Sequence, residues 1–165
     1  MPYNDILPTI HPDAWIAPGA VIIGDVHIGA HTNVWFGCVI RGDVNTIRIG
    51  ERTNIQDGTI IHVTRKTGPT RIGSGITIGH KALLHACTLE HDCFIGMGAT
   101  VMDNAVVESG AYLAAGAQLT PNKRVPAGQM WAGNPAKHFR DVKEDEAEFI
   151  GISAQNYVNL SKEYK

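Results

Sequence analysis

Aliphatic residues recur at every sixth position along most of this chain, and small or polar residues fill the gaps between them. The recurring positions form five sets of three: Ile28, Val34, Ile40; Ile49, Ile55, Ile61; Ile72, Ile78, Leu84; Leu89, Ile95, Val101; and Val107, Leu113, Leu119. Between sets the step is nine, eleven, five and then six residues. A helix would need apolar residues at steps of three and four, which these segments lack. The pattern instead predicts a three-sided coil with loops at one corner.

A period of six residues is typical of a parallel β-helix, in which each unit forms a short strand followed by a turn. Three units close one triangular coil, the aliphatic residues point inward, and the coils stack on one another. Glycine is frequent, with 18 residues, and glycine, Asn and Asp tolerate the turn conformations between strands. We therefore expect an all-β solenoid over residues 1–130.

The pattern changes after the Pro- and Gly-rich stretch PAGQMWAGNPAKHFR, which predicts a cap and a turn. From Asp141 the sequence is charged, and Phe149, Ile150, Tyr157 and Leu160 fall at helical steps. We expect residues 131–165 to form this turn and a C-terminal α-helix that packs on the coil.

Composition and charge narrow the possible functions. The chain has 165 residues and a net charge of −2, with no long run of one sign, so nucleic acid is not an expected partner. No apolar stretch approaches the ~20 residues that span a membrane. The opening MPYNDILPTI lacks the basic stretch and apolar core of a signal peptide. Three cysteines without a CxxC pair fit a reducing compartment, so we expect a cytoplasmic protein.

Two histidines occupy equivalent positions in consecutive coils. His62 follows Ile61 and His85 follows Leu84, so each lies one residue beyond the third inward position. They should stack about 5 Å apart, the spacing of neighbouring strands. Two stacked imidazoles can converge by tilting to the roughly 3.3 Å that separates nitrogens on one tetrahedral zinc ion. Arg41 begins the same column one coil earlier.

His80 belongs to another side of the triangle. It lies two residues beyond Ile78, in the same column as Asp57, and we do not expect it to reach the other two histidines of its own chain. If three prisms pack around a threefold axis, a neighbouring chain supplies it. Each site would then combine His62 and His85 of one chain with the third histidine of the next. Three neutral nitrogens and one open position are the arrangement of a catalytic zinc.

Four segments of the chain resemble the gamma-class carbonic anhydrases: RGDVNTIRIGERTNIQDGTIIHVT, IGHKALLHAC, IGMGATVMDNAVV and GNPAK. The resemblance extends from Trp15 to the terminal helix. It implies a left-handed β-helix and a homotrimer with one metal ion at each subunit interface. It makes His62, His80 and His85 the metal ligands, and the activity the reversible hydration of CO2 to bicarbonate. Zinc is the expected metal, and three imidazoles also suit iron or cobalt.

The resemblance also implies catalytic roles for three residues. Gln56 is similar to the residue that hydrogen-bonds the metal-bound water, and Asp57 to the carboxylate that orients groups around the site. Tyr157 is similar to a tyrosine that reaches the edge of the active site from the C-terminal helix.

Three other residues are implied to be structural. Arg41 and Asp43 resemble the salt bridge that holds the family's trimer together at its interface. Asn54 belongs to the same NIQD motif as the catalytic pair.

The sequence departs from the best-studied active members at two places. Val44 stands where they carry a glutamate after RGD, and the loop VTRKTGPTR has no carboxylate where theirs is acidic and thought to export protons. Slow turnover is therefore expected. Two other interpretations stay open: a non-catalytic metal-binding trimer, and a thioester hydrolase or acyltransferase built on hexapeptide repeats. Acyltransferases need one basic histidine rather than three that converge.

Overall fold

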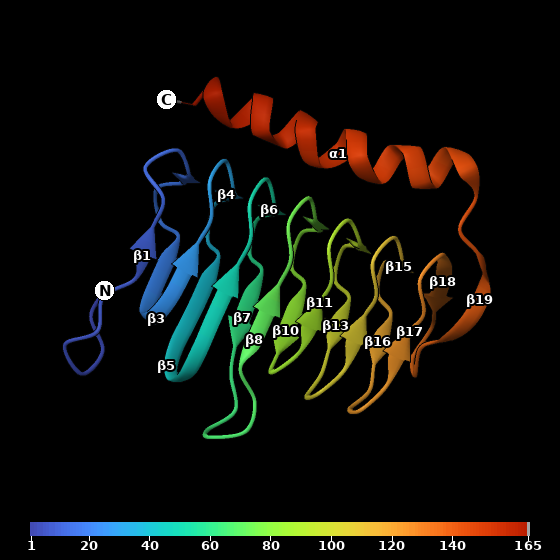
Figure 1. The fold of residues 1–165 in the computed structure, drawn as a ribbon, viewed down its shortest axis with the longest axis horizontal. Coiled ribbons are helices and arrows are strands. Elements are labelled where there is room, and N and C mark those ends of the chain that lie inside the picture. Colours follow the sequence, from blue (N-terminus) through green and yellow to red (C-terminus); the bar gives the residue numbers. More distant parts are fainter. Residues whose placement is uncertain (165) are drawn as a thin grey trace.

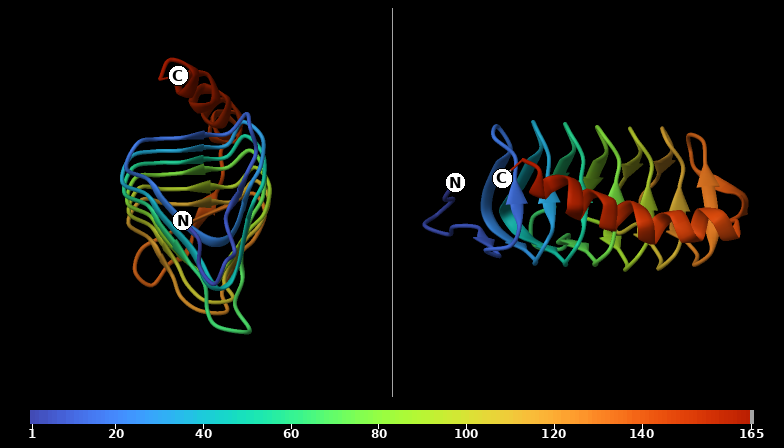
Figure 2. Two further views of the ribbon diagram at one scale, coloured as in Figure 1. Left: turned by 90° about the vertical axis from the view of Figure 1, so that its left-hand side faces the viewer. Right: turned by 90° about the horizontal axis from the view of Figure 1, so that it is seen from above.

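The protein, described here by a computed structural model over residues 1–164, winds its short strands into a coil of triangular cross-section (Figures 1 and 2). Over these residues the strands form two sheets, with eleven and eight members. Apart from the antiparallel β18–β19 pair, the strands pair in parallel with their equivalents in neighbouring coils.

The first sheet covers two faces of the triangle. Its strands are β1 (Thr9–Ile10), β3 (Val21–Ile28), β5 (Val39–Ile49), β7 (Ile60–His62), β8 (Thr70–Ile72), β10 (Leu83–His85), β11 (Thr88–Leu89), β13 (Thr100–Val101), β14 (Val106–Val107), β16 (Gln118–Leu119) and β17 (Arg124–Val125). The long strand β5 joins the two faces, because its first residues pair with β7 and its last residues pair with β8. We call the face formed by β7, β10, β13, β16 and the start of β5 the histidine face.

The second sheet forms the third face. Its strands are β2 (Trp15–Ile16), β4 (Asn33–Val34), β6 (Asn54–Ile55), β9 (Thr77–Ile78), β12 (Phe94–Ile95), β15 (Tyr112–Leu113), β18 (Gln129–Ala132) and β19 (Lys137–Asp141). The single helix over residues 1–164, α1 (Glu144–Lys162), runs along this sheet and contacts β4, β6 and β9 (Figure 1). We call this the helix face.

The core consists of the residues that recur every six positions. All fifteen predicted inward side chains are buried, and none exposes more than 4% of its surface. They stack in register from coil to coil, as where Leu84 lies between Ile61 and Val101. The predicted fold class, a left-handed parallel β-helix of hexapeptide repeats with a C-terminal α-helix, is confirmed.

Glycine follows many inward residues because the backbones of neighbouring coils approach closely there. A Cβ atom on Gly96 would lie 2.3 Å from the backbone nitrogen of Ala115, so no side chain fits. Gly79 occupies the equivalent position one coil earlier, where a Cβ would lie 2.6 Å from the nitrogen of Met97. Both glycines lie on the helix face beside a pocket described below.

The end of the coil differs from the turn expected after residue 130. Strand β19 folds back and pairs antiparallel with β18, which covers the open edge of the last coil. The chain then enters α1, whose Ile150, Ala154 and Val158 are buried against the helix face. Within the described residues, no helix is both long and apolar enough to cross a membrane.

Candidate metal centre

His62 and His85 lie side by side on the histidine face. They are register partners on β7 and β10, as the repeat predicted. Their ring centroids are 5.2 Å apart and the rings are tilted by 50°. The strand pairing therefore sets the spacing of this histidine pair.

Asp43 connects His62 to Arg41 within the same chain. One carboxylate oxygen, Oδ1, lies 3.0 Å from Nε2 of His62, and the other accepts a hydrogen bond from the Arg41 guanidinium. Partial burial opposes ionisation of Asp43, but the hydrogen bonds from His62 and Arg41 outweigh it and lower the pKa of this carboxyl. Both partners of the predicted interface salt bridge thus lie next to the histidine pair, where they contact each other.

Asp103 holds His85 in a similar way, and the sequence interpretation did not identify it. Its Oδ1 lies 2.7 Å from Nδ1 of His85, and its Oδ2 accepts a hydrogen bond from the hydroxyl of Thr64. The register pairs Leu84 with Val101, so His85 is opposite residue 102, and Asp103 reaches it diagonally from the following turn. The sequence signal that could have indicated this contact is the position of Asp103, an acidic residue at the same corner of the next coil.

His80 lies at a different corner, after a strand of the helix face. Its Nδ1 is 2.9 Å from Oδ2 of Asp57, which confirms that these two residues share a column. Phe36 and Met97 occupy the same column in the coils on either side. The N–H of Gly58, the residue after Asp57, donates to the carbonyl oxygen of Phe36, and the N–H of Gly98, the residue after Met97, donates to the carbonyl oxygen of His80. Exposed side chains of Phe36 and Met97 flank the pair in this column.

Gln56 is held in one orientation by a chain of buried hydrogen bonds. Asn54 donates through Nδ2 to the hydroxyl of Thr77, at 2.8 Å, and to the carbonyl oxygen of Ile76. Its Oδ1 must therefore accept, and it accepts from Nε2 of Gln56 at 3.1 Å. Thr77 is tied in turn to Ser153 of α1 at 2.9 Å. The Oε1 atom of Gln56 is left as a hydrogen-bond acceptor.

Gln56, His80 and Tyr157 line one pocket between the helix face and α1. The pocket has a volume of about 270 Å³, and its other walls include Phe94, Met97, Tyr112 and Phe149. Burial, with a smaller contribution from the nearby charge of Asp57, raises the pKa of the Tyr157 hydroxyl. These three polar groups therefore line a largely apolar pocket.

The predicted site is thus divided between two corners that border the histidine face. One corner carries His62 and His85 with Asp43 and Asp103, and the other carries His80 with its own aspartate. Over residues 1–164, no group of three His, Cys, Asp or Glu side chains lies close enough to hold a metal ion.

The chemistry of the donor set fits a divalent metal. Each of the three histidines has one ring nitrogen on a carboxylate, and within the described chain the other ring nitrogen has no hydrogen-bond partner. A neutral imidazole held in this way presents a free lone pair. Zinc, iron and cobalt all accept imidazole ligands.

Comparison with known proteins places the chain among its relatives. A family model described as bacterial transferase hexapeptide (six repeats) matches residues 8–42. The carbonic anhydrase of Geobacillus kaustophilus is 38% identical over 164 residues, which are 99% of this chain and 90% of that protein. Gamma carbonic anhydrase 1, mitochondrial, of Arabidopsis thaliana is 49% identical over 163 residues, which are 96% of this chain. This chain belongs to the gamma-class carbonic anhydrase family.

A solved structure agrees with this assignment at the level of fold. A hexapeptide transferase family protein from Anaplasma phagocytophilum has a TM-score of 0.96 and 49% identity, with 99% of this chain and 96% of that chain covered. The chain spans 59% of the length of the Arabidopsis gamma carbonic anhydrase.

Proposed function

We propose that the chain forms a homotrimer that binds one metal ion at each subunit interface and catalyses the reversible hydration of CO2 to bicarbonate. The observation that supports this most directly is the division of three carboxylate-held histidines between two corners of the histidine face. A copy packed against that face would set its His80 beside the His62–His85 pair. Neither corner carries enough ligands by itself.

Exposed apolar side chains on the same surface support this association. Ile60 and Leu83 are register partners that point outward from the histidine face, and they expose 46% and 39% of their surfaces. Phe36 and Met97, beside His80, expose 38% and 59%. Apolar side chains grouped beside candidate ligands are typical of an interface between subunits.

The residues around the site suit hydration chemistry. When bound, the metal supplies Lewis-acid activation, which lowers the pKa of water from 15.7 to about 7. The Oε1 atom of Gln56 can accept a hydrogen bond from the attacking water and turn a lone pair of that water toward CO2. Asp57 lies 2.9 Å from the ring of His80, where it would orient that ligand, and Tyr157 borders an apolar pocket that would receive CO2.

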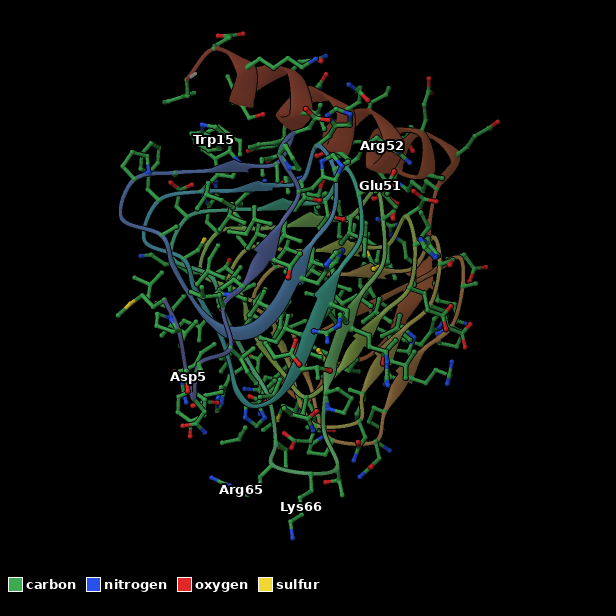
Figure 3. The ribbon with its side chains drawn as sticks, turned by 60° about the vertical axis from the view of Figure 1, so that its left-hand side comes forward. Asp5, Trp15, Glu51, Arg52, Arg65 and Lys66 are labelled. Atoms are coloured by element: carbon green, nitrogen blue, oxygen red, sulfur yellow. The ribbon has the colours of Figure 1, made fainter. Side chains whose placement is uncertain are left out.

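The structure offers no evident carboxylate for proton export on the loop after His62. Val44 packs against the core rather than presenting a polar group to solvent. Arg65 and Lys66 project from the tip of the loop, away from the body of the protein (Figure 3). We therefore propose that turnover is slow and limited by transfer of the proton to buffer, so the rate should rise with buffer concentration.

The decisive test is stopped-flow CO2 hydration on protein loaded with zinc and, without oxygen, with iron. We expect the wild-type rate to exceed the uncatalysed rate and to increase with buffer. His85→Ala should lose both the metal and the added rate, because it removes one of two ligands on its corner. His138→Ala is the matched control: this histidine lies on β19, away from both corners, and its loss should leave metal content and rate unchanged.

Two outcomes would count against the proposal. Full metal content in His85→Ala would show that the ligand assignment is wrong. Full metal content in the wild type with a rate equal to the blank would show that CO2 is not the substrate, and would leave a metal-binding trimer without this activity.

The pocket favours ester or thioester hydrolysis as a second candidate. Its volume of about 270 Å³ lies just below the ~300–1,000 Å³ typical of ligand pockets. Four apolar or aromatic walls next to Gln56 and His80 would suit an acyl group better than they suit CO2 alone. Hydrolysis of short acyl thioesters that is lost in His85→Ala, with no CO2 hydration, would favour this function.

The cysteines bear on location. Cys38, Cys87 and Cys93 are free and buried. Free thiols persist in reducing compartments, so the cytoplasm is the location that we propose.

A further inference from the structure

Asp103 is the one carboxylate at the metal centre whose contacts extend into a loop. Its two oxygens serve different partners: Oδ1 binds Nδ1 of His85, and Oδ2 accepts from the Thr64 hydroxyl. Asp43 differs, because its second oxygen serves Arg41, which lies on the same strand. Asp103 therefore connects a predicted metal ligand to a segment that lies outside the regular coil.

Thr64 begins a closed loop. Its backbone pairs antiparallel with Gly68, with hydrogen bonds of 2.9 and 3.3 Å, and its carbonyl oxygen accepts from Asn45 at 3.0 Å. Gly68 in turn lies directly on Ala86, the residue after His85, since a Cβ on this glycine would come within 2.7 Å of the Ala86 side chain. The base of the loop therefore contacts Ala86 directly and reaches the His85 ring through Asp103.

The tautomer of His85 follows from this arrangement. A carboxylate only accepts, so Nδ1 of the neutral ring must carry the proton that Asp103 receives in a hydrogen bond. The lone pair then lies on Nε2, where the ring has no other partner within the described chain. Outer carboxylates of this kind fix the orientation of a histidine ligand and raise its basicity.

We infer that Asp103 is a positioning residue of the metal centre, and that Thr64 couples the loop of residues 64–68 to His85 through it. Asp103 holds the ring with Nε2 free, and the Thr64 hydroxyl holds Asp103 in place. The positioning role rests on the proposed metal-dependent function. The contacts from which it is inferred are all within the metal-free chain.

The first test is nitrogen NMR of the histidine rings in metal-free protein at about pH 8, where ordinary imidazoles are neutral. We expect the wild-type His85 to carry its proton on Nδ1, and Asp103→Ala to lose this preference. Zinc affinity, measured by competition with a chromophoric chelator, should fall by about 10–100-fold in Asp103→Ala. Thr64→Val, which keeps the shape and loses the hydroxyl, should show a smaller loss of the same sign.

Limited trypsin digestion reports on the loop. Arg65 and Lys66 provide cleavage sites at its exposed tip (Figure 3). We expect Thr64→Val and Asp103→Ala to be cut several-fold faster than wild type, because the base of the loop opens more often. Thr67→Val is the matched control: it makes the same substitution on the same loop, at an exposed residue whose hydroxyl makes no hydrogen bond within the described chain.

The outcomes separate this inference from the proposed function. A wild-type tautomer and wild-type zinc affinity in Asp103→Ala would overturn it, and so would faster cleavage of Thr64→Val with unchanged zinc affinity. An enforced tautomer, together with faster cleavage and weaker zinc binding in both variants, would support it even if the loaded wild type hydrates no CO2.

Discussion

At the scale of single residues, the three histidines of the proposed metal centre share one feature, which is a carboxylate beside each ring. Each ring contacts a different aspartate, at 3.0, 2.9 and 2.7 Å for His62, His80 and His85. One ring nitrogen of each is thereby committed, and the other is free to bind a metal. The three carboxylates come from three different turns of the coil.

The cysteines give a prediction at the same scale. Burial raises the pKa of the Cys87 thiol to about 12 and that of Cys38 to about 11, and it raises the pKa of Cys93 as well. At pH 8 roughly one Cys87 in ten thousand is a thiolate, and the thiolate is the reactive form. We expect Ellman's reagent to react very slowly with the native protein. After unfolding in urea, it should react readily with all three thiols. Rapid reaction of any thiol in the native protein would contradict this expectation.

The sequence predicted the site residues that obey the period of six. His62 and His85 occupy equivalent positions, so counting was enough to stack them, and the same counting paired His80 with Asp57. The sequence did not predict a role for Asp103, because this residue does not lie opposite His85 in the register. It sits one residue further along, in a turn, and reaches the ring only through its side-chain conformation. The orientation of Gln56 was equally inaccessible, because it depends on buried bonds that reach Ser153 in the helix.

At the scale of elements, the fold was predictable where the core dictates it and less so at its end. Inward aliphatic residues specify the coil, since each of them stacks on its equivalent in the next coil. Strand β19 carries no such signal: its residues are mostly exposed, and it forms because the edge of β18 is available. Its return across the last coil then sets where α1 begins.

An ion pair between β19 and α1 gives a prediction at this scale. The guanidinium of Arg140 donates to both carboxylate oxygens of Glu146, at 2.7 and 2.6 Å, and the backbone N–H of Lys143 donates to the same carboxylate at 2.9 Å. These bonds lower the pKa of Glu146 from 4.5 to about 2. A depressed pKa stabilises the fold above pH 4.5, and that stabilisation is lost as the pH falls toward 2.

Glu146→Gln should therefore lower the Tm at neutral pH by roughly 2–4 °C. The gap between variant and wild type should close as the pH falls from about 4.5 to about 2. Thermal melts followed by circular dichroism across this range would measure it. Glu148→Gln is the control, because this exposed glutamate of the same helix makes no ion pair within residues 1–164. A gap that stays constant down to pH 2 would show that the ion pair does not stabilise the docked helix.

At the scale of the whole molecule, substitutions at two adjacent leucines should distinguish folding of the chain from assembly of the proposed trimer. Leu84 points into the core and is fully buried, whereas Leu83 points outward from the histidine face and is 39% exposed. Leu84→Ala should cost about 2–5 kcal/mol of unfolding free energy, as core truncations do. Leu83→Asp should leave the coil folded, because its side chain contributes little to the core, but should place a charge in the proposed subunit interface.

We expect the wild type to sediment as three chains and Leu83→Asp to sediment as a single chain with an unchanged circular dichroism spectrum. Metal content should fall with association, although His62, His80 and His85 are all intact in the variant. This follows because the single chain keeps its ligands on separate corners, and only a neighbour brings them together. Analytical ultracentrifugation with metal analysis of each fraction would measure both quantities. A single wild-type chain that retains one metal ion would contradict the shared site, since the described chain holds no cluster of three ligands.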